Sequence, residues 1–190
     1  EKEGAALAFW LGEAPRVAST KSGRWITHAE SGHAIWRDAS LTARVDASPL
    51  GFGTLAAHGH LDAMHVSLWS EGQPLVIDAG TGGYYGDAAL RAKLAAWEAH
   101  NGPVPVCGRN VPMRAGPFLW REHHDVPKME IVDEVCVVRF ACDGPFMKRS
   151  VQMAGRSARI TDEVCGRTAH VVTWQLAPEW EQVENLTWRH

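Results

Sequence analysis

Short runs of alternating hydrophobic and polar residues, separated by glycine, proline and aspartate, follow one another from residue 33 onwards. Such alternation is typical of half-buried β-strands, because successive side chains of an extended chain point to opposite faces. We expect the first strands over residues 33–37, 41–45, 64–69 and 74–78. Asp38-Ala39-Ser40 is the predicted turn between the first two strands, and Glu71-Gly72 is the predicted tight turn between the last two.

The remainder of the chain carries the same pattern at regular intervals. Further strands are predicted over residues 129–141, 146–153, 157–164 and 169–176. The helical patterns are short: residues 5–11, and the alanine-rich residues 87–99 with Asp87 as a candidate N-cap. The sequence therefore predicts an all-β fold, a two-sheet antiparallel β-sandwich with a few short helices.

The composition is that of an ordinary globular domain, since 45% of the 190 residues are hydrophobic and 22% are charged. The net charge of -3 gives no basic footprint, so we expect no nucleic-acid partner. No apolar run is long enough to cross a membrane, and Glu1-Lys2-Glu3-Gly4 does not resemble a signal peptide. The four cysteines form no C-x-x-C pair, which argues against a cysteine zinc site.

Histidines gather in one stretch, residues 53–65. His58 and His60 are two residues apart, so in an extended chain their side chains would point to the same face. Asp78 ends the predicted returning strand and His100 follows the predicted helix, so both could come back towards them. Two imidazoles and one carboxylate form a common zinc shell, which would leave one histidine free to act on a substrate. Spacing alone also allows these histidines to be ordinary surface or core residues.

Three motifs, in order, resemble the heparinase II/III-like family of polysaccharide lyases. They are His58-Gly59-His60-Leu61-Asp62-Ala63, then Asp78-Ala79-Gly80-Thr81, then Ala99-His100-Asn101. The β-domain of that family carries the patterns H-G-H-x-D-A, D-x-G-T and A-H-N. The resemblance extends from about residue 30 to residue 176, which is most of the chain.

The resemblance implies a supersandwich-like β-domain in which zinc is held by His60, Asp78 and His100, and in which a catalytic His58 points into the substrate cleft. It implies an acidic polysaccharide as partner, cleavage of uronic-acid-containing chains by β-elimination, and a periplasmic or secreted location in bacteria. Residues 1–20 would be the tail of the helical toroid domain that precedes residues 21–190 in such enzymes. Because the family's toroid supplies a tyrosine and the groups that neutralise the substrate carboxylate, we expect this chain to be inactive by itself.

The sequence departs from the family in two places. A tyrosine that some alginate-type members use would fall near Lys93 and is missing, and Gly102-Pro103 stands where the family favours Thr-Val. Tyr84 and Tyr85 are the two tyrosines of the chain; they could line the cleft and bind substrate, or they could pack. The sequence does not select among alginate, heparan-type chains and bacterial exopolysaccharides.

Two other functions fit parts of the sequence. A cupin-like metalloenzyme would place a metal on His58, His60 and His65, although a second cupin motif is not visible. A non-catalytic carbohydrate-binding module would use some of the nine tryptophans as platforms for sugar rings. The histidines that bind the metal distinguish the cupin-like enzyme from the lyase.

Overall fold

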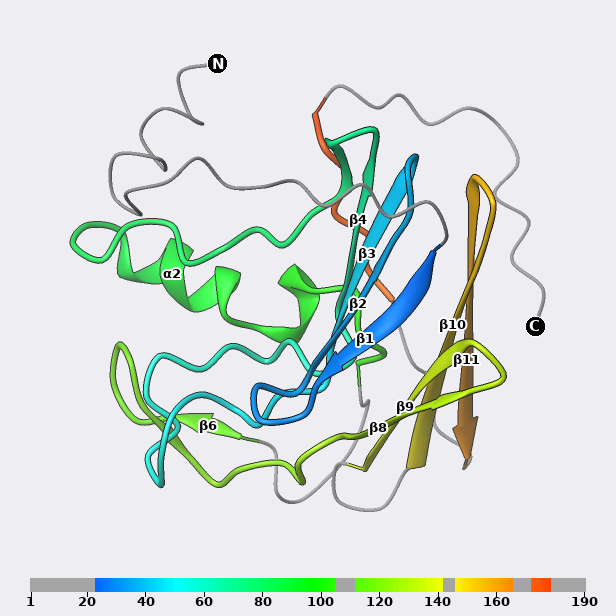
Figure 1. Ribbon diagram of the computed structural model, residues 1–190. Helices are drawn as coiled ribbons and strands as arrows, with labels where there is room; N and C mark the ends of the chain where they lie inside the picture. Colours follow the sequence, from blue (N-terminus) through cyan, green and yellow to red (C-terminus); the bar gives the residue numbers. More distant parts are fainter. Residues whose placement is uncertain (1–22, 105–111, 142–145, 166–171, 179–190) are drawn as a thin grey trace, which may run out of the picture.

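The computed structural model of the protein describes residues 23–104, 112–141, 146–165 and 172–178. Two antiparallel sheets face each other in these residues (Figure 1), so the predicted all-β sandwich is confirmed. The first sheet has the order β1-β2-β3-β4-β5 and the second the order β11-β10-β9-β8. The strands of the first sheet are β1 (Arg24–His28), β2 (His33–Arg37), β3 (Leu41–Asp46), β4 (Val66–Ser70) and β5 (Gln73–Val76).

The turns of the first sheet form as predicted. Asp38 closes the β2–β3 turn, because its Oδ1 accepts hydrogen bonds from the backbone N–H groups of Ser40 and Leu41. Glu71 and Gly72 both have positive φ, 51° and 81°, as a tight hairpin turn of matching twist requires. β4 begins two residues later than predicted, at Val66, since Met64 has a φ of 68° and cannot continue a strand. β1 was not predicted.

The second sheet contains β8 (Lys128–Val132), β9 (Val135–Ala141), β10 (Phe146–Ala154) and β11 (Ser157–Cys165). The prediction of one strand over residues 129–141 is wrong: Asp133 and Glu134 have φ of 47° and 63° and form a two-residue turn between β8 and β9. The short strands β6 (Met113–Arg114) and β7 (Trp120–Arg121) pair in a separate hairpin that the sequence pattern did not predict.

The core fills the space between the two sheets. Inward-facing residues of the first sheet include Val45 and Val66, which pair with each other, and those of the second include Phe140 and Met147, which also pair. All four are at most 2% exposed. Burial of such side chains is the main source of folding free energy, and it fixes the strand register because a slip of one residue would turn the apolar set outwards.

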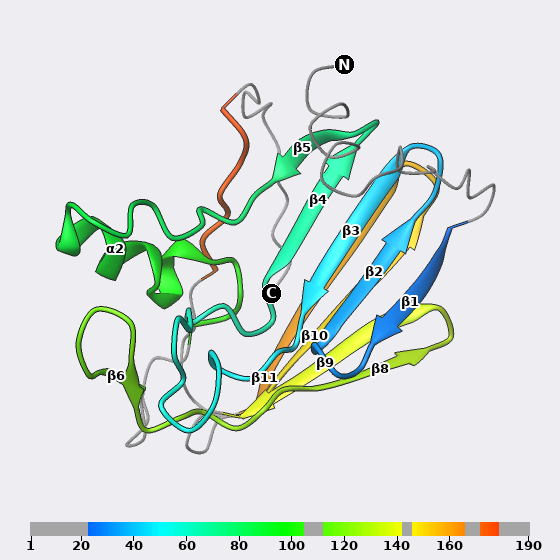
Figure 2. The ribbon, with the colours of Figure 1, turned by 60° about the vertical axis from the view of Figure 1, so that its left-hand side comes forward.

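The predicted helix over residues 87–99 forms in two pieces. The α-helix α2 (Ala88–Leu94) is capped by Asp87, whose carboxylate accepts from the N–H groups of Ala89 and Leu90. The chain then enters a 3-10 turn, η1 (Trp97–Ala99). Helix α2 lies at one end of the sandwich, together with the loop over residues 47–65 and the β6–β7 hairpin (Figures 1 and 2).

Two predicted elements near the ends of the chain are not established. The helix over residues 5–11 lies outside the described residues. Of the predicted strand over 169–176, residues 172–175 form no strand, and Leu176 makes only an isolated bridge to Val76. Within the part of the chain that the structure describes, no helix has the length and apolar character needed to cross a bilayer.

Candidate functional site

Neighbouring strands of the first sheet run in opposite directions. One end of the sheet therefore brings together the end of β3, the start of β4 and the end of β5. The residues that flank these strands therefore become neighbours: Asp46 ends β3, His65 precedes β4, and Asp78 follows β5. The loop over residues 47–65 folds over this edge. Two backbone hydrogen bonds hold this loop in place: Leu61 N–H donates to the Ala95 carbonyl, and Trp120 N–H donates to the Leu55 carbonyl.

His58 and His60 both line a cleft beside this loop, but not because they lie on one face of an extended chain, as the sequence suggested. The stretch is a series of turns rather than a strand, and His58 has a φ of 57°. A left-handed conformation is uncommon for a residue with a Cβ atom and is found where surrounding contacts impose it. Gly59 lies very close to the backbone of Gly51. A Cβ atom added at Gly59 would stand 2.8 Å from the Gly51 nitrogen, so a side chain at Gly59 would force these two segments of the loop apart.

His58 is an exposed side chain held by aromatic neighbours. Its backbone N–H donates to the Phe118 carbonyl at 2.8 Å, and its ring lies 5.1 Å from the Phe118 ring and 5.9 Å from the Tyr84 ring, measured between centroids. Tyr84 therefore packs beside His58 while remaining 53% exposed. Tyr85 is 98% exposed and contacts neither ring. The structure thus separates the two tyrosines that the sequence could not distinguish.

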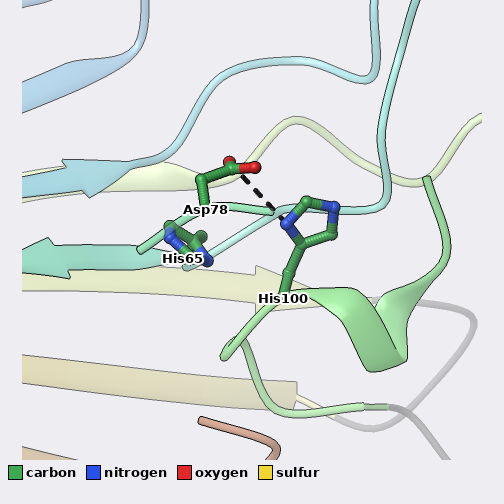
Figure 3. A group of neighbouring side chains, drawn as sticks. All are labelled: His65, Asp78 and His100. Carbon is green, nitrogen blue, oxygen red and sulfur yellow. Dashed lines mark ion pairs between the residues drawn. The ribbon is translucent and has the colours of Figure 1, made fainter. Parts of the chain in front are cut away.

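His100 lies fully buried beside Asp78 (Figure 3). Its Nδ1 is 3.8 Å from Oδ2 of Asp78, and neither of its ring nitrogens has a hydrogen-bond partner in the described residues. Burial lowers the pKa of His100, which keeps the imidazole neutral with a free lone pair. A buried polar atom without a partner costs about 1–3 kcal/mol, so this arrangement is the kind that a bound cation would relieve.

Two further histidines lie next to His100. The ring centroids of both His60 and His65 are 5.5 Å from that of His100. His65, Asp78 and His100 each offer a ligand atom, and those atoms lie within 4.8 Å of one another. His65 was a metal ligand only in the cupin-like alternative; the resemblance implied His60.

The hydrogen bonds of the two histidines differ. His65 is fully buried; its Nδ1 accepts from Asn101 N–H at 3.3 Å and its Nε2 lies 3.1 Å from the Ser67 hydroxyl. Burial lowers the pKa of His65 to about 4, so the ring is neutral and Nε2 carries the proton. His60 is half-buried, and its Nε2 has only Thr81 Oγ1 at 3.4 Å. A cation could therefore bind His60 without breaking a buried hydrogen bond, whereas binding His65 would break one.

A buried arginine of the second sheet braces the segment that carries His100. Arg149 is 0% exposed and donates two hydrogen bonds of 2.7 Å to the carboxylate of Asp162. Its Nη1 donates to the Met64 carbonyl at 2.8 Å and to Asn101 Oδ1 at 3.1 Å. The Asn101 side chain in turn pairs with both backbone groups of Val66, as a neighbouring strand would. The position of His100 thus depends on both sheets.

The cleft has a volume of about 600 Å³ and a mixed charge. On one wall, His33 Nε2 lies 3.1 Å from Asp46 Oδ2, and this hydrogen bond raises the pKa of His33. Burial alone would raise the pKa of Asp46, but the hydrogen bonds from His33 and Ser48 outweigh burial and lower it. Burial, with the nearby charges of Asp46 and Asp78, raises the pKa of Asp62 to about 8.

Sequence reasoning missed Arg44, His33, Asp46 and Arg149. The signal for Arg149 was present, because it shares its phase along β10 with the apolar residues Met147 and Val151. Arg44 and Asp46 carried the opposite signal, since they alternate with Ala43 and Val45 and so belong to the outer face of the sheet. That this outer face forms a wall of the cleft depends on the fold of the loop over residues 47–65, which has no periodic pattern.

The family model described as "Heparinase II/III-like, C-terminal" matches residues 22–189. A crystal structure of heparinase III is similar, with a TM-score of 0.50 and 16% identity; the similarity covers 73% of this chain and 21% of that one. The chain thus spans about a fifth of the length of that relative. No curated protein matches the sequence. The chain belongs to the heparinase II/III-like family of polysaccharide lyases, and it carries the β-sandwich that the family model describes as C-terminal.

Proposed function

We propose that this β-sandwich is part of a lyase that cleaves uronic-acid-containing polysaccharide by β-elimination, with His58 as a catalytic residue. The observation that carries the proposal is the placement of His58. It is exposed, lines the cleft, and is held in a left-handed backbone conformation by its contacts with Phe118. Together with membership of the family, this placement favours a catalytic role over that of an ordinary surface histidine.

β-Elimination requires three functions around one sugar ring. The uronate carboxylate must be neutralised so that the C5 proton becomes acidic, a base must take that proton, and an acid must protonate the leaving glycosidic oxygen. Histidine side chains are suited to proton transfer because they exchange protons near neutral pH. His58 would move a proton at C5 or at the glycosidic oxygen, and Tyr84, packed beside it, would contact the same sugar. Tyr85 is exposed to solvent and would bind a sugar of the polysaccharide farther from the cleaved bond.

We further propose that the site holds one zinc ion on His60, Asp78 and His100. The unpartnered ring nitrogens of buried His100, the adjacent carboxylate and the nearly free Nε2 of His60 support this set. Two imidazoles and a carboxylate suit zinc better than calcium or magnesium, which prefer oxygen ligands. When bound, the ion would supply a cross-link between the loop that presents His58, the end of β5 and the segment after η1. Ser67 and Asn101 would keep His65 as a buried support.

The remaining catalytic functions would come from elsewhere in a longer protein. A preceding helical toroid domain would supply the second acid or base, and a periplasmic or secreted location in bacteria would give access to the polymer. Both follow from the family rather than from the described residues. Loss of one member of a cooperative catalytic unit already costs several orders of magnitude in rate, so the 190 residues alone should show little turnover.

The proposal is tested with the natural full-length protein and a series of uronate polymers. Elimination leaves an unsaturated sugar end that absorbs ultraviolet light, so its formation can be followed directly. We expect turnover of at least one polymer by the wild type, loss by a factor of at least 100 in His58→Ala with unchanged zinc content and circular dichroism, and little turnover by residues 1–190 alone. Full activity of His58→Ala would remove His58 from the mechanism, and efficient turnover by the isolated chain would show that the site is complete without a further domain.

A further inference from the structure

Arg44 is a cation of the cleft that has almost no partner among the described residues. It lies in the middle of β3, on the outer face of the first sheet, between Ile35 of β2 and Ser67 of β4. It is the only arginine or lysine among the described residues that line the cleft. Its closest carboxylate is that of Asp78, 3.7 Å from Nη2, which is an ion-pair distance but too long for a hydrogen bond.

The guanidinium group of Arg44 therefore has unused hydrogen-bonding capacity. In the described residues it donates no hydrogen bond, and its buried Nε has no partner. Arg149 shows the contrast, since its guanidinium donates four hydrogen bonds inside the protein. A third of the Arg44 side chain, 36%, is exposed, so a ligand in the cleft can reach it.

Two of the carboxyl groups near Arg44, those of Asp46 and Asp78, already have other partners. Asp46 accepts from His33 and from both the N–H and the hydroxyl of Ser48. Asp78 accepts from Gly80 N–H at 2.7 Å and faces His100. If Asp78 serves a metal ion, its charge is less available to Arg44, which lines the same cleft as His58. A planar guanidinium binds a carboxylate through parallel hydrogen bonds, and this geometry distinguishes a carboxylate from a neutral hydroxymethyl group.

We propose that Arg44 binds the carboxylate of a uronate residue in the cleft, and that this β-sandwich itself thereby selects acidic over neutral sugars. The inference rests on the proposed function, because it takes a uronate polymer as the substrate. It assigns part of the carboxylate neutralisation to this domain rather than to a partner domain. Arg44 would then act on the same sugar ring from which His58 moves a proton.

The experiment measures oligouronate binding by calorimetry to the full-length protein carrying His58→Ala, so that the ligand is not cleaved. Arg44→Met, Arg44→Lys and Arg37→Met are compared in this background. Arg37 is the matched control: it lies on the same outer face, is exposed and is not part of the cleft. A second ligand, the same oligosaccharide with its carboxylates reduced to hydroxymethyl groups, separates charge recognition from sugar contacts, and zinc content is measured for each variant.

We expect Arg44→Met to weaken oligouronate binding by at least tenfold, Arg44→Lys to restore part of the loss, and Arg37→Met to stay within twofold of the parent. Binding of the reduced ligand should be the same with and without Arg44, and zinc content should not change. Equal effects of Arg44→Met and Arg37→Met would overturn the inference. So would equal losses for both ligands, or a loss of zinc in proportion to the loss of binding, which would make Arg44 a support for Asp78. A wild-type protein that neither binds nor cleaves any oligouronate would instead overturn the proposed function.

Discussion

Both ring nitrogens of His100 are buried without a hydrogen-bond partner in the part of the chain that the structure describes, while both ring nitrogens of nearby His65 are hydrogen-bonded. The two histidines are about equally buried, at 0% exposure, so burial does not distinguish them. The difference lies in what each imidazole can still accept. A lone pair that is already used in a hydrogen bond must be released before it can bind a cation, and His100 has no such bond to break.

This difference predicts how substitutions respond to zinc. His60→Ala should lower the melting temperature of the zinc-loaded protein, because binding to the native state stabilises it by about 2.7 kcal/mol when free metal is a hundredfold above its Kd. With a chelator present, His60→Ala should melt like the wild type. His65→Ala should melt lower under both conditions, since it removes two buried hydrogen bonds, and exposed His58→Ala should change little in either. Equal effects of His58→Ala and His60→Ala would contradict the proposed ligand set.

The ion pair between His33 and Asp46 gives stability a dependence on pH. The pKa of His33 is raised above 6.5, so its contribution is complete below 6.5 and is lost as the pH rises through the raised value. The pKa of Asp46 is lowered below 3.8, so its contribution is complete above 3.8 and is lost as the pH falls through the lowered value. The pair therefore stabilises the fold most between pH 3.8 and 6.5.

Melting curves of the wild type and His33→Gln test this pH dependence. The wild type should melt higher by a few degrees at pH 5.5, which corresponds to about 1 kcal/mol for a domain of this size. The difference should shrink as the pH rises towards 9. Taking the difference between the two proteins removes the titration of the other histidines, which is common to both. A constant or growing difference above pH 7 would mean that His33 does not act through its charge.

Elements that the sequence predicted correctly are those whose pattern is local. The alternation in β2, β3 and β10 and the turn at Glu71-Gly72 can be read over a few residues. The turn at Asp133-Glu134 is harder to recognise, because only Asp133 is a common turn residue and Glu134 also adopts a positive φ. The motifs of the site were recognisable for the same reason. Their convergence was not, because Asp78 and His100 meet only through the end of β5 and the segment after η1.

The link between the two sheets predicts that the second sheet influences the site. Asp162→Asn should reduce the free energy of unfolding by about 3–5 kcal/mol, because it leaves buried Arg149 without its counter-charge. It should also weaken zinc binding, since Arg149 donates to Asn101, the neighbour of His100. Glu163→Gln is the matched control: Glu163 follows Asp162 in β11 and pairs with Lys148 at the surface. Urea unfolding and a zinc titration measure the two effects. Similar results for Asp162→Asn and Glu163→Gln would show that the hydrogen bonds of Arg149 do not influence the site.

At the scale of the whole molecule, the cleft lies beside one end of the first sheet. The cleft is lined by Arg44 of β3, by Asp78, which follows β5, and by His58 and His60 of the loop over residues 47–65. The second sheet covers the inner face, and its Arg149 donates hydrogen bonds to Met64 and Asn101. The similar heparinase III chain is about five times as long as its part that matches this chain.

The claim that the reaction is an elimination can be tested most directly by cleaving a defined oligouronate in water enriched in oxygen-18. Elimination breaks the bond between the uronate C4 and the glycosidic oxygen without adding water, so the masses of the two products should sum to that of the substrate. Hydrolysis would add one water molecule, which carries oxygen-18. The products are reduced with borohydride at early times, because the oxygen of a reducing end exchanges slowly with water. We predict that the natural full-length protein gives one product with an unsaturated end and no added water; a product pair heavier than the substrate by one labelled water molecule would contradict the account.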